Sequence, residues 1–250
     1  MGRIRAVVFD LFDTLVDLVF ESLPLIEVGE RRIPSTYRAL HDVIVQRADL
    51  DFETFARELA SVDREGRDRV LAEGREYPTL ERFQALLGRL ALADLGLAEE
   101  LTLTHMAKLS ETARFHPHHP GVLCELRQTA RIGICSNFSH APTARKLLEE
   151  AGLLPHIDAA VISEEVGIRK PRREIFEAAL ERLGASHEQT IHVGDNLRAD
   201  VEGAAALGIT AVWITRRVPN PEQALHNYTG PPPAHIIADL SELPALVAGA

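Results

Sequence analysis

Five short apolar runs, separated by segments with a helical pattern, limit the possible folds of this chain more than any other feature of its sequence. The runs are residues 4–9, 131–135, 159–162, 190–193 and 210–214. Runs of this length, rich in branched side chains, are typical of strands that are buried on both faces of a parallel sheet. Between them lie helical patterns at 141–151, 173–183 and 199–207. Strands and helices in alternation predict βαβ crossovers, so we expect an α/β fold with a doubly wound parallel sheet. Residues 236–237 predict an edge strand before a closing helix.

Residues 17–115 interrupt this alternation. They contain no convincing strand, and their helical patterns cover 37–47, 52–71, 79–92 and 101–112, with Asp51 and Thr79 as expected N-caps. We therefore expect an all-helical insertion of residues 17–115 in a core domain made of residues 1–16 and 116–250. The segment from His116 to Gly121 holds two prolines and is expected to be an extended return hinge rather than a metal site.

Composition narrows the possible partners. The 250 residues include 27 Lys plus Arg against 37 Asp plus Glu, a net charge of −10, which is a poor match to nucleic acid or to an anionic membrane. No apolar run approaches the ~18–20 residues of a membrane span. Cys124 and Cys135 are expected to be small buried apolar side chains, as suits a reducing compartment. We expect a cytoplasmic protein without nucleic-acid or membrane partners.

Polar residues of complementary type follow the predicted strands. Asp10 ends the first strand, Ser136 and Asn137 the second, and Asp195 the fourth, while Lys170 follows the third. Each of them alone has an ordinary interpretation as a cap, a turn residue or a surface residue. Ligands of open α/β sheets bind where the strands end, so polar residues at four successive strand ends predict a functional site.

The same residues carry a resemblance to a known family. The order Asp10-x-x-x-Thr14, Ser136, Lys170-Pro171 and Gly194-Asp195-x-x-x-x-Asp200 resembles the haloacid dehalogenase-like (HAD) hydrolases. The helical insertion resembles the mobile helical-bundle cap of that superfamily. The resemblance covers essentially the whole chain. It implies a hydrolase with a Rossmann-like core, which acts on a small-molecule substrate that the cap domain selects.

The resemblance also implies a division of roles. A carboxylate can form a covalent intermediate, so Asp10 would attack phosphorus to give an aspartyl phosphate. Phosphoryl transfer depends on positioning and on charge neutralisation. Lys170 would supply positive charge, Ser136 a hydroxyl donor, and Asn137 could add an amide donor.

The resemblance further implies Mg²⁺, a hard ion that takes oxygen ligands. Asp10 and Asp195 would bind it with their carboxylates, and Phe12 with its backbone carbonyl. Asp200 would lie in the outer shell of the metal and orient Lys170 or a metal-bound water.

Phe12 departs from the phosphatase pattern, in which a second Asp at this place protonates the leaving oxygen and activates water. Asp13 is its acidic neighbour, and Asp17, Glu21 or His41 could also supply a proton; the sequence selects none of them. An aromatic residue here resembles the 2-haloacid dehalogenases, which expel halide without a proton or a metal.

Three functions therefore stay open: a Mg²⁺-dependent phosphatase, a 2-haloacid dehalogenase with Arg38 as its halide cradle, and a protein that binds a phosphorylated ligand with little turnover. Asp195 favours the phosphatase, because two acids side by side are costly without a cation between them. Phe12 suits phosphate chemistry when the leaving group is already stable, as in an acyl or aryl phosphate. The sequence leaves open the natural substrate and whether the chain is a monomer or a homodimer. His192 and Trp213 are expected in the core.

Overall fold

The computed structural model describes residues 4–28, 31–92 and 94–249. The chain divides into two compact units. The core unit is the chain up to Asp17 together with everything from Phe115 onward, and the helical unit is Leu18–Arg114. A two-stranded sheet of β2 (Val16–Leu18) and β5 (Ala113–Phe115) lies at the two chain crossings. Among the described residues, none of the helices has the length and apolar character that a membrane crossing needs.

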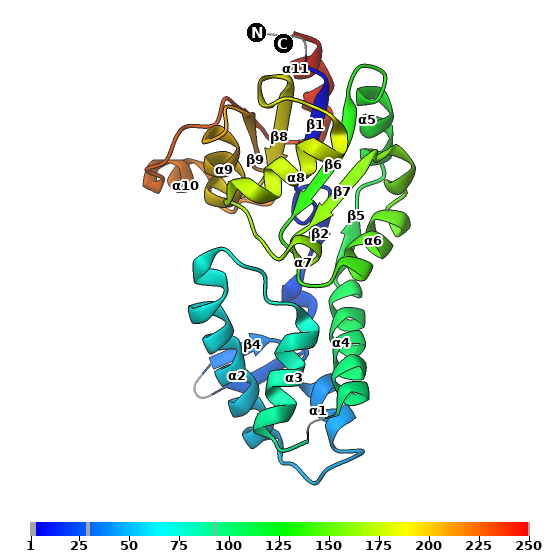
Figure 1. Cartoon of the computed structure of the whole chain (residues 1–250), viewed down its shortest axis with the longest axis vertical. Coiled ribbons are helices and arrows are strands. Elements are labelled where there is room, and N and C mark those ends of the chain that lie inside the picture. Colours follow the sequence, from blue (N-terminus) through cyan, green and yellow to red (C-terminus); the bar gives the residue numbers. More distant parts are fainter. Residues whose placement is uncertain (1–3, 29–30, 93, 250) are drawn as a thin grey trace. The chain divides into compact units, whose positions relative to one another are not determined.

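A six-stranded parallel sheet forms the centre of the core unit, with strand order β10-β9-β8-β1-β6-β7 (Figure 1). The chain winds outward from β1 in both directions, which confirms the doubly wound α/β fold. All five predicted strands and the edge strand are present. Their bounds are β1 (Ala6–Phe9), β6 (Arg131–Ser136), β7 (Ala159–Ile162), β8 (Thr190–Gly194), β9 (Thr210–Ile214) and β10 (His235–Ile237).

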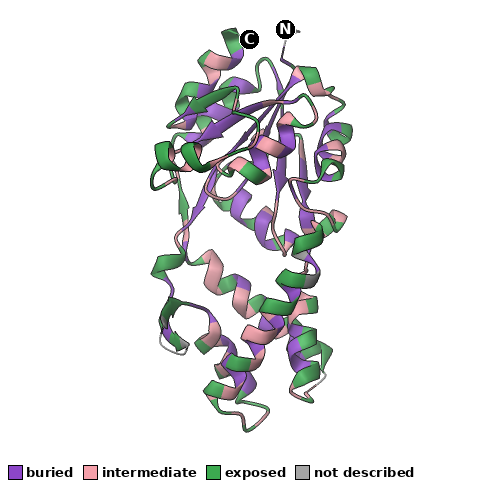
Figure 2. Cartoon of the chain, turned by 90° about the vertical axis from the view of Figure 1, so that its left-hand side faces the viewer, coloured by how far each residue is buried: buried purple, intermediate pink, exposed green. Residues whose placement is uncertain are grey.

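Helices cover both faces of this sheet. One face packs against α8 (Arg173–Leu183) and α9 (Gly203–Ala205), in a cluster that includes the fully buried Trp213 and Phe176. On the other face, α5 (His119–Leu126) contacts β6 and α11 (Leu243–Gly249). Figure 2 shows the strands as mostly buried and the helices with exposed outer faces. The remaining helices of the unit are α6 (Ala141–Glu150), α7 (Ser163–Val166) and α10 (Pro221–Asn227).

Three details of the core unit differ from the sequence prediction. The helix expected at 199–207 is a π-helical turn, η5 (Leu197–Glu202), followed by the short α9. It begins two residues earlier than its pattern suggested, because Asn196 caps it by accepting from two backbone N–H groups. The hinge prediction is wrong for 119–121, which lie in α5; proline fits the first turn of a helix, where no N–H bond is lost. Cys135 is buried as expected, but Cys124 is exposed on α5.

The helical unit contains α1 (Tyr37–Ile44), α2 (Phe52–Arg69), α3 (Thr79–Arg89) and α4 (Leu95–Ser110), around a core of Leu, Val and Phe side chains. Asp51 caps α2 as predicted, accepting from the Thr54 N–H at 2.8 Å. The N-cap of α3 is Pro78 and not Thr79, which is already helical. Helix α4 begins six residues earlier than its pattern suggested, because Asp94 caps it through the Leu97 N–H.

The prediction of an all-helical insertion over residues 17–115 is wrong at its two ends, where β2 and β5 pair, and in one place inside it. A hairpin of β3 (Leu25–Val28) and β4 (Arg31–Pro34) precedes α1, with Leu25 opposite Pro34 and Ile26 opposite Ile33. Of these apolar residues Ile26 is buried, whereas Leu25 and Ile33 are exposed. Two four-residue strands with so little buried surface produce only a weak alternating pattern in the sequence.

Candidate active site

The predicted site residues of three strands meet at one edge of the sheet. Asp10 follows β1, Ser136 ends β6, and Asp195 follows β8. Because β1 pairs in parallel with both β6 and β8, the carboxyl ends of these strands lie side by side. The topology therefore brings Asp10 together with Ser136 and Asp195, both of which lie more than a hundred positions later in the chain.

Lys170 is the cation of this edge. Its ammonium Nζ lies 2.8 Å from Asp10 Oδ1 and 2.7 Å from Asp200 Oδ1, and its side chain is 1% exposed. Burial alone would lower the pKa of Lys170, but the charges of Asp10 and Asp200 raise it above its usual range. Lys170 is therefore a fixed positive charge beside Asp10.

Asn137 holds the backbone of Lys170 in place. Its Nδ2 donates to the Lys170 carbonyl at 3.0 Å, and its Oδ1 accepts from the Lys170 N–H at 2.8 Å. The sequence suggested that Asn137 would donate to a phosphoryl oxygen. The structure instead turns its amide toward the loop that carries Lys170.

Asp10, Asp195 and Asp200 form a compact cluster of acids. One carboxylate oxygen from each lies within 4.8 Å of the other two. Burial and the charges of Asp10 and Asp200 raise the pKa of Asp195 well above its usual range. Burial also raises the pKa of Asp10, although Lys170 opposes this. A divalent cation would relieve the repulsion, and an all-oxygen donor set suits Mg²⁺, so these residues fit the ion.

Asp200 is tied into the core by more than Lys170. His192 Nε2 donates to Asp200 Oδ1 at 2.8 Å, and the Asn196 N–H donates to Oδ2 at 3.1 Å. Burial opposes ionisation, but Lys170 and His192 hold the pKa of Asp200 at about 2. His192 is buried in β8 as expected, but no pattern in the sequence predicts its bond to Asp200.

Gly194 makes room for the same carboxylate. A Cβ on Gly194 would lie 2.2 Å from Cγ of Asp200, a distance that no packed pair of atoms tolerates. This close approach explains why glycine stands directly before Asp195. The Asp195 carbonyl in turn accepts from Trp213 Nε1 at 2.7 Å.

Two hydroxyl groups, one in the loop after Asp10 and one at the end of β6, are buried and unsatisfied. Thr14 Oγ1 and Ser136 Oγ have no hydrogen-bond partner among the described residues, and both residues are at most 1% exposed. Buried hydroxyls without partners are rare, because losing water costs free energy unless another bond replaces it. Both groups can donate to an oxygen of a bound anion.

The loop after Asp10 shows how Phe12 is accommodated. The ring of Phe12 packs against that of Phe138, with centroids 4.5 Å apart. Asp13 takes a left-handed backbone conformation (φ 58°), and its carboxylate accepts from Arg217 Nε at 3.4 Å. Neither Arg217 nor its neighbour Arg216 was singled out from the sequence.

The other proposed proton donors have partners of their own. Asp17 accepts two hydrogen bonds from Arg216 and one from His116. Burial alone would raise the pKa of Asp17, but these bonds lower it, so Asp17 is an ionised acceptor. In the helical unit, His41 Nε2 donates to the Leu50 carbonyl at 2.8 Å.

Arg38 and Glu21 also lie in the helical unit. The guanidinium of Arg38 lies 3.8 Å from the centre of the Phe52 ring, a cation–π contact that already employs its charge. Glu21 is exposed on a short 3₁₀ turn. The surroundings of Arg38 and of Glu21 give no indication that either residue takes part in the reaction.

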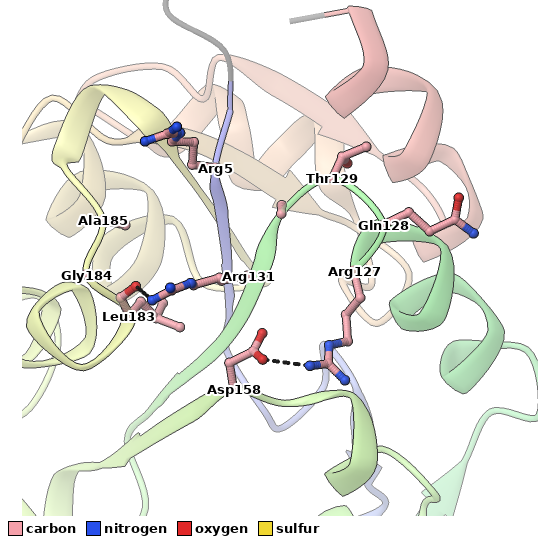
Figure 3. A pocket seen from close by; sticks show the side chains of 10 residues that line it. Arg5, Arg127, Gln128, Thr129, Arg131, Asp158, Leu183, Gly184 and Ala185 are labelled. Carbon is pink, nitrogen blue, oxygen red and sulfur yellow. Dashed lines mark hydrogen bonds and ion pairs between the residues drawn. The ribbon is translucent and has the colours of Figure 1, made fainter.

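A pocket of about 520 Å³ lies at the other edge of the sheet (Figure 3). Arg5, just before β1, and Arg131, the first residue of β6, line it. Arg127 is bound there to Asp158 at 2.7 Å, and Arg131 donates to the Leu183 carbonyl at 2.7 Å. This pocket is separate from the acid cluster, because it lies at the amino ends of the strands.

The chain belongs to the haloacid dehalogenase-like hydrolases: the family model matches residues 4–208. It is similar to a glyceraldehyde 3-phosphate phosphatase of Methanopyrus kandleri, with 31% identity over 220 residues, 85% of this chain and 84% of the relative.

Two solved structures share the fold. The 2-haloacid dehalogenase from Pseudomonas syringae has a TM-score of 0.70 at 23% identity, covering 98% of this chain and 99% of that chain. The HAD-hydrolase YfnB from Bacillus subtilis, described as bound to magnesium, has a TM-score of 0.60 at 24% identity with the same coverage. The chain is thus a hydrolase of a family that contains both phosphatases and dehalogenases.

Proposed function

We propose that the chain is a Mg²⁺-dependent phosphatase that acts on a small phosphorylated molecule. The observation that carries this proposal is the carboxylate of Asp195 beside that of Asp10, with donor oxygens within 4.8 Å. Displacement of halide from carbon needs no second acid, and a second negative charge opposes the ionised nucleophile. The similarity to a glyceraldehyde 3-phosphate phosphatase supports the same reaction class.

Asp10 is the nucleophile in this proposal. Its carboxylate oxygen attacks phosphorus, the bond from phosphorus to the ester oxygen breaks, and an aspartyl phosphate forms. Water then attacks the phosphorus, the bond from phosphorus to the Asp10 oxygen breaks, and inorganic phosphate leaves with the protons of the water, which restores the Asp10 carboxylate. Lys170, 2.8 Å from Asp10 Oδ1, favours the ionised form of Asp10 against the effect of burial and neutralises charge on the phosphoryl oxygens.

Asp10 and Asp195 would hold Mg²⁺ with their carboxylates, and Phe12 with its backbone carbonyl. Asp200 would act from the outer shell, since its oxygens already accept from Lys170, His192 and the Asn196 N–H. When bound, the ion supplies positive charge to the transferring phosphoryl group and removes the repulsion among the acids.

The unsatisfied hydroxyls of Thr14 and Ser136 complete the phosphate site. Each would donate to a phosphoryl oxygen, which would replace the hydrogen bond that its burial removed. Asn137 would act as a positioning residue, because its amide holds the backbone of Lys170.

The leaving group must suit a site that has Phe12 in place of an acid. Asp17 is a poor proton donor, because Arg216 and His116 hold it in the ionised form. In acyl and aryl phosphates the leaving group is stable as an anion, so it departs without a proton. We therefore propose that these react faster than alkyl phosphates.

The helical unit would serve as the cap domain and select the substrate. Its separation from the core unit as a compact body agrees with that role. The side chains that would contact the substrate belong to this unit and to the loops after the strands.

A 2-haloacid dehalogenase is the second candidate, and Phe12 favours it. The ring is packed against Phe138, so the position has the aromatic character expected of an enzyme that expels halide without a proton. This function would need Asp10 but no metal.

The deciding experiment measures phosphate release from a panel of alkyl, acyl and aryl phosphates. Each is assayed with Mg²⁺, with a chelator, and with the Asp10→Asn variant as the blank. We expect release that requires both Mg²⁺ and Asp10. Halide release from 2-haloacids that persists in chelator, without phosphate release, would replace the proposal by the dehalogenase. Saturable binding of phosphorylated ligands without any turnover would replace it by the binding function.

A further inference from the structure

A second group of potential metal ligands lies in the core unit, apart from the acid cluster. It consists of His118 and His119 at the start of α5 and of Asp239, the residue before the short helix η6 (Leu240–Glu242). One donor atom from each residue lies within 4.8 Å of the other two. His118 Nε2 already donates to Asp239 Oδ1 at 3.1 Å, although the residues are 121 positions apart.

His119 is oriented as a metal-binding histidine would be. Its Nδ1 donates to the Leu15 carbonyl at 2.9 Å, which places the proton on Nδ1 and a lone pair on Nε2. His119 is 1% exposed, and its Nε2 has no hydrogen-bond partner among the described residues. A backbone carbonyl that fixes the other ring nitrogen is the usual support for a histidine ligand.

Asp239 is held in place independently of the histidines. Its Oδ1 accepts from the Ser241 N–H at 2.9 Å and from the Ser241 hydroxyl at 2.6 Å, as the N-cap of η6. The ring of His116 packs against that of His119, with centroids 4.6 Å apart, but His116 Nε2 donates to Asp17. The hydrogen bond to Asp17 engages the His116 nitrogen, so the candidate ligands are His118, His119 and Asp239.

We propose that His118, His119 and Asp239 form a second metal site, for a borderline divalent ion of the Zn²⁺ type. Two imidazoles and one carboxylate are a common protein donor set for Zn²⁺, whereas Mg²⁺ prefers an all-oxygen set like that of the acid cluster. The ion joins the start of α5 to the segment before η6. Through His119 and its bond to Leu15, it also stiffens the loop that begins at Asp10.

The test is a calorimetric titration of the metal-stripped full chain with Zn²⁺, in excess Mg²⁺. The Asp195→Asn variant is titrated in parallel, because it disables the acid cluster as a competing Zn²⁺ site. We expect one Zn²⁺ to bind with equal affinity in both proteins. Zn²⁺ should also raise the midpoint of thermal unfolding, since a ligand that binds only the folded state stabilises it.

Two substitutions probe the ligands without disturbing the buried His119. His118→Ala removes an exposed side chain, and Asp239→Asn retains an acceptor for the Ser241 cap. Each should weaken Zn²⁺ binding by at least about tenfold and abolish the Zn²⁺-dependent rise in unfolding midpoint. The matched control, His226→Ala on the exposed side of α10, should change neither.

The proposal is overturned if wild type and Asp195→Asn bind no Zn²⁺, or if His118→Ala and Asp239→Asn bind it as tightly as wild type. Unfolding midpoints measured without Zn²⁺ establish that the variants are folded. The proposal does not depend on the phosphatase function, and phosphate release under Mg²⁺ alone tests that function separately.

Discussion

Asp17 and Asp195 lie in the same unit, and their surroundings shift their pKa values in opposite directions. Asp17 is buried against Arg216 and His116, which lower its pKa despite the cost of burial. Asp195 is buried beside Asp10 and Asp200, and burial and these charges together raise its pKa. At Asp17 the protein supplies the balancing cation. At Asp195 Lys170 offsets only part of the negative charge, and the remainder is available to a bound metal.

The strongest test of this comparison removes the nucleophile itself. Asp10→Asn keeps the size of the side chain but loses the charge, so we expect phosphate release to fall by at least ~10³-fold. Initial rates with an aryl phosphate and Mg²⁺ measure this. Asp49→Asn, at an exposed position of the helical unit, is the control and should keep full activity. Residual activity close to wild type would remove Asp10 from the mechanism.

The second prediction concerns the proton donor that the site lacks, since Phe12 carries no acid and Asp17 is ionised. If Phe12 is the only defect for ordinary esters, Phe12→Asp should raise the rate with alkyl phosphates by about 10²-fold, the lower end of general acid–base catalysis. The rate with acyl phosphates should change much less. Phe12→Asn is the matched control, since the side chain of Asn has the shape of Asp but carries no carboxyl proton to transfer. Equal rates in both variants would mean that the site is built for other chemistry.

The third prediction concerns Asp17, whose charge is balanced by Arg216 and His116. Asp17→Asn leaves the guanidinium of Arg216 without its counter-charge, so the free energy of unfolding should fall by about 3 kcal/mol. Urea denaturation at neutral pH measures it. Glu177→Gln is the control, because it breaks an exposed ion pair with Arg173 and should cost less than about 1 kcal/mol. Equal losses in both variants would contradict the importance of burial.

The fourth prediction concerns Asp195, whose replacement should raise the stability of the fold and not lower it. In chelator, Asp195→Asn should stabilise the fold by about 1 kcal/mol, because it removes an acid whose ionisation is opposed by burial and by the charges of Asp10 and Asp200. In Mg²⁺ the wild type should gain stability and the variant should not. A loss of stability in Asp195→Asn under chelator would show that the cluster is already balanced.

The same acid has a pH signature. The folded-state pKa of Asp195 is raised from 3.8 to about 8, so without metal the folded state binds more protons than the unfolded state in that interval. Stability in chelator should therefore be fully present at low pH and be lost, as far as Asp195 contributes, as the pH rises through that range. Mg²⁺ should reduce the loss, and Asp195→Asn should abolish it.

Much of the core unit was predictable because its signals are local. An apolar run followed by one acid identifies both a buried strand and its end, as in residues 4–10. Pairing in parallel then places Asp10, Ser136 and Asp195 at one edge, without any knowledge of side-chain contacts. The family motif with Thr14 and Asp200 adds the expectation of a metal site there.

The predictions that were wrong depended on weak or non-local signals. The hairpin of β3 and β4 buries too little to produce a clear pattern. Cys124 is exposed because the inward side of α5 is occupied by its neighbours Val122, Leu123 and Leu126. The π-helical turn that carries Asp200 begins where Asn196 caps it, and the helical pattern does not show this.

The sequence by itself determined the strands, the α/β alternation and the acids at the strand ends, because periodicity and strand termini depend on neighbouring residues. Only the tertiary structure decided which charges are balanced. Arg216 reaches Asp17 across 199 positions of the chain, and His192 meets Asp200 through the fold of β8 onto the π-helical turn. The free energy of a buried charge depends on everything within a few ångströms of it, and folding brings those groups together from distant parts of the sequence.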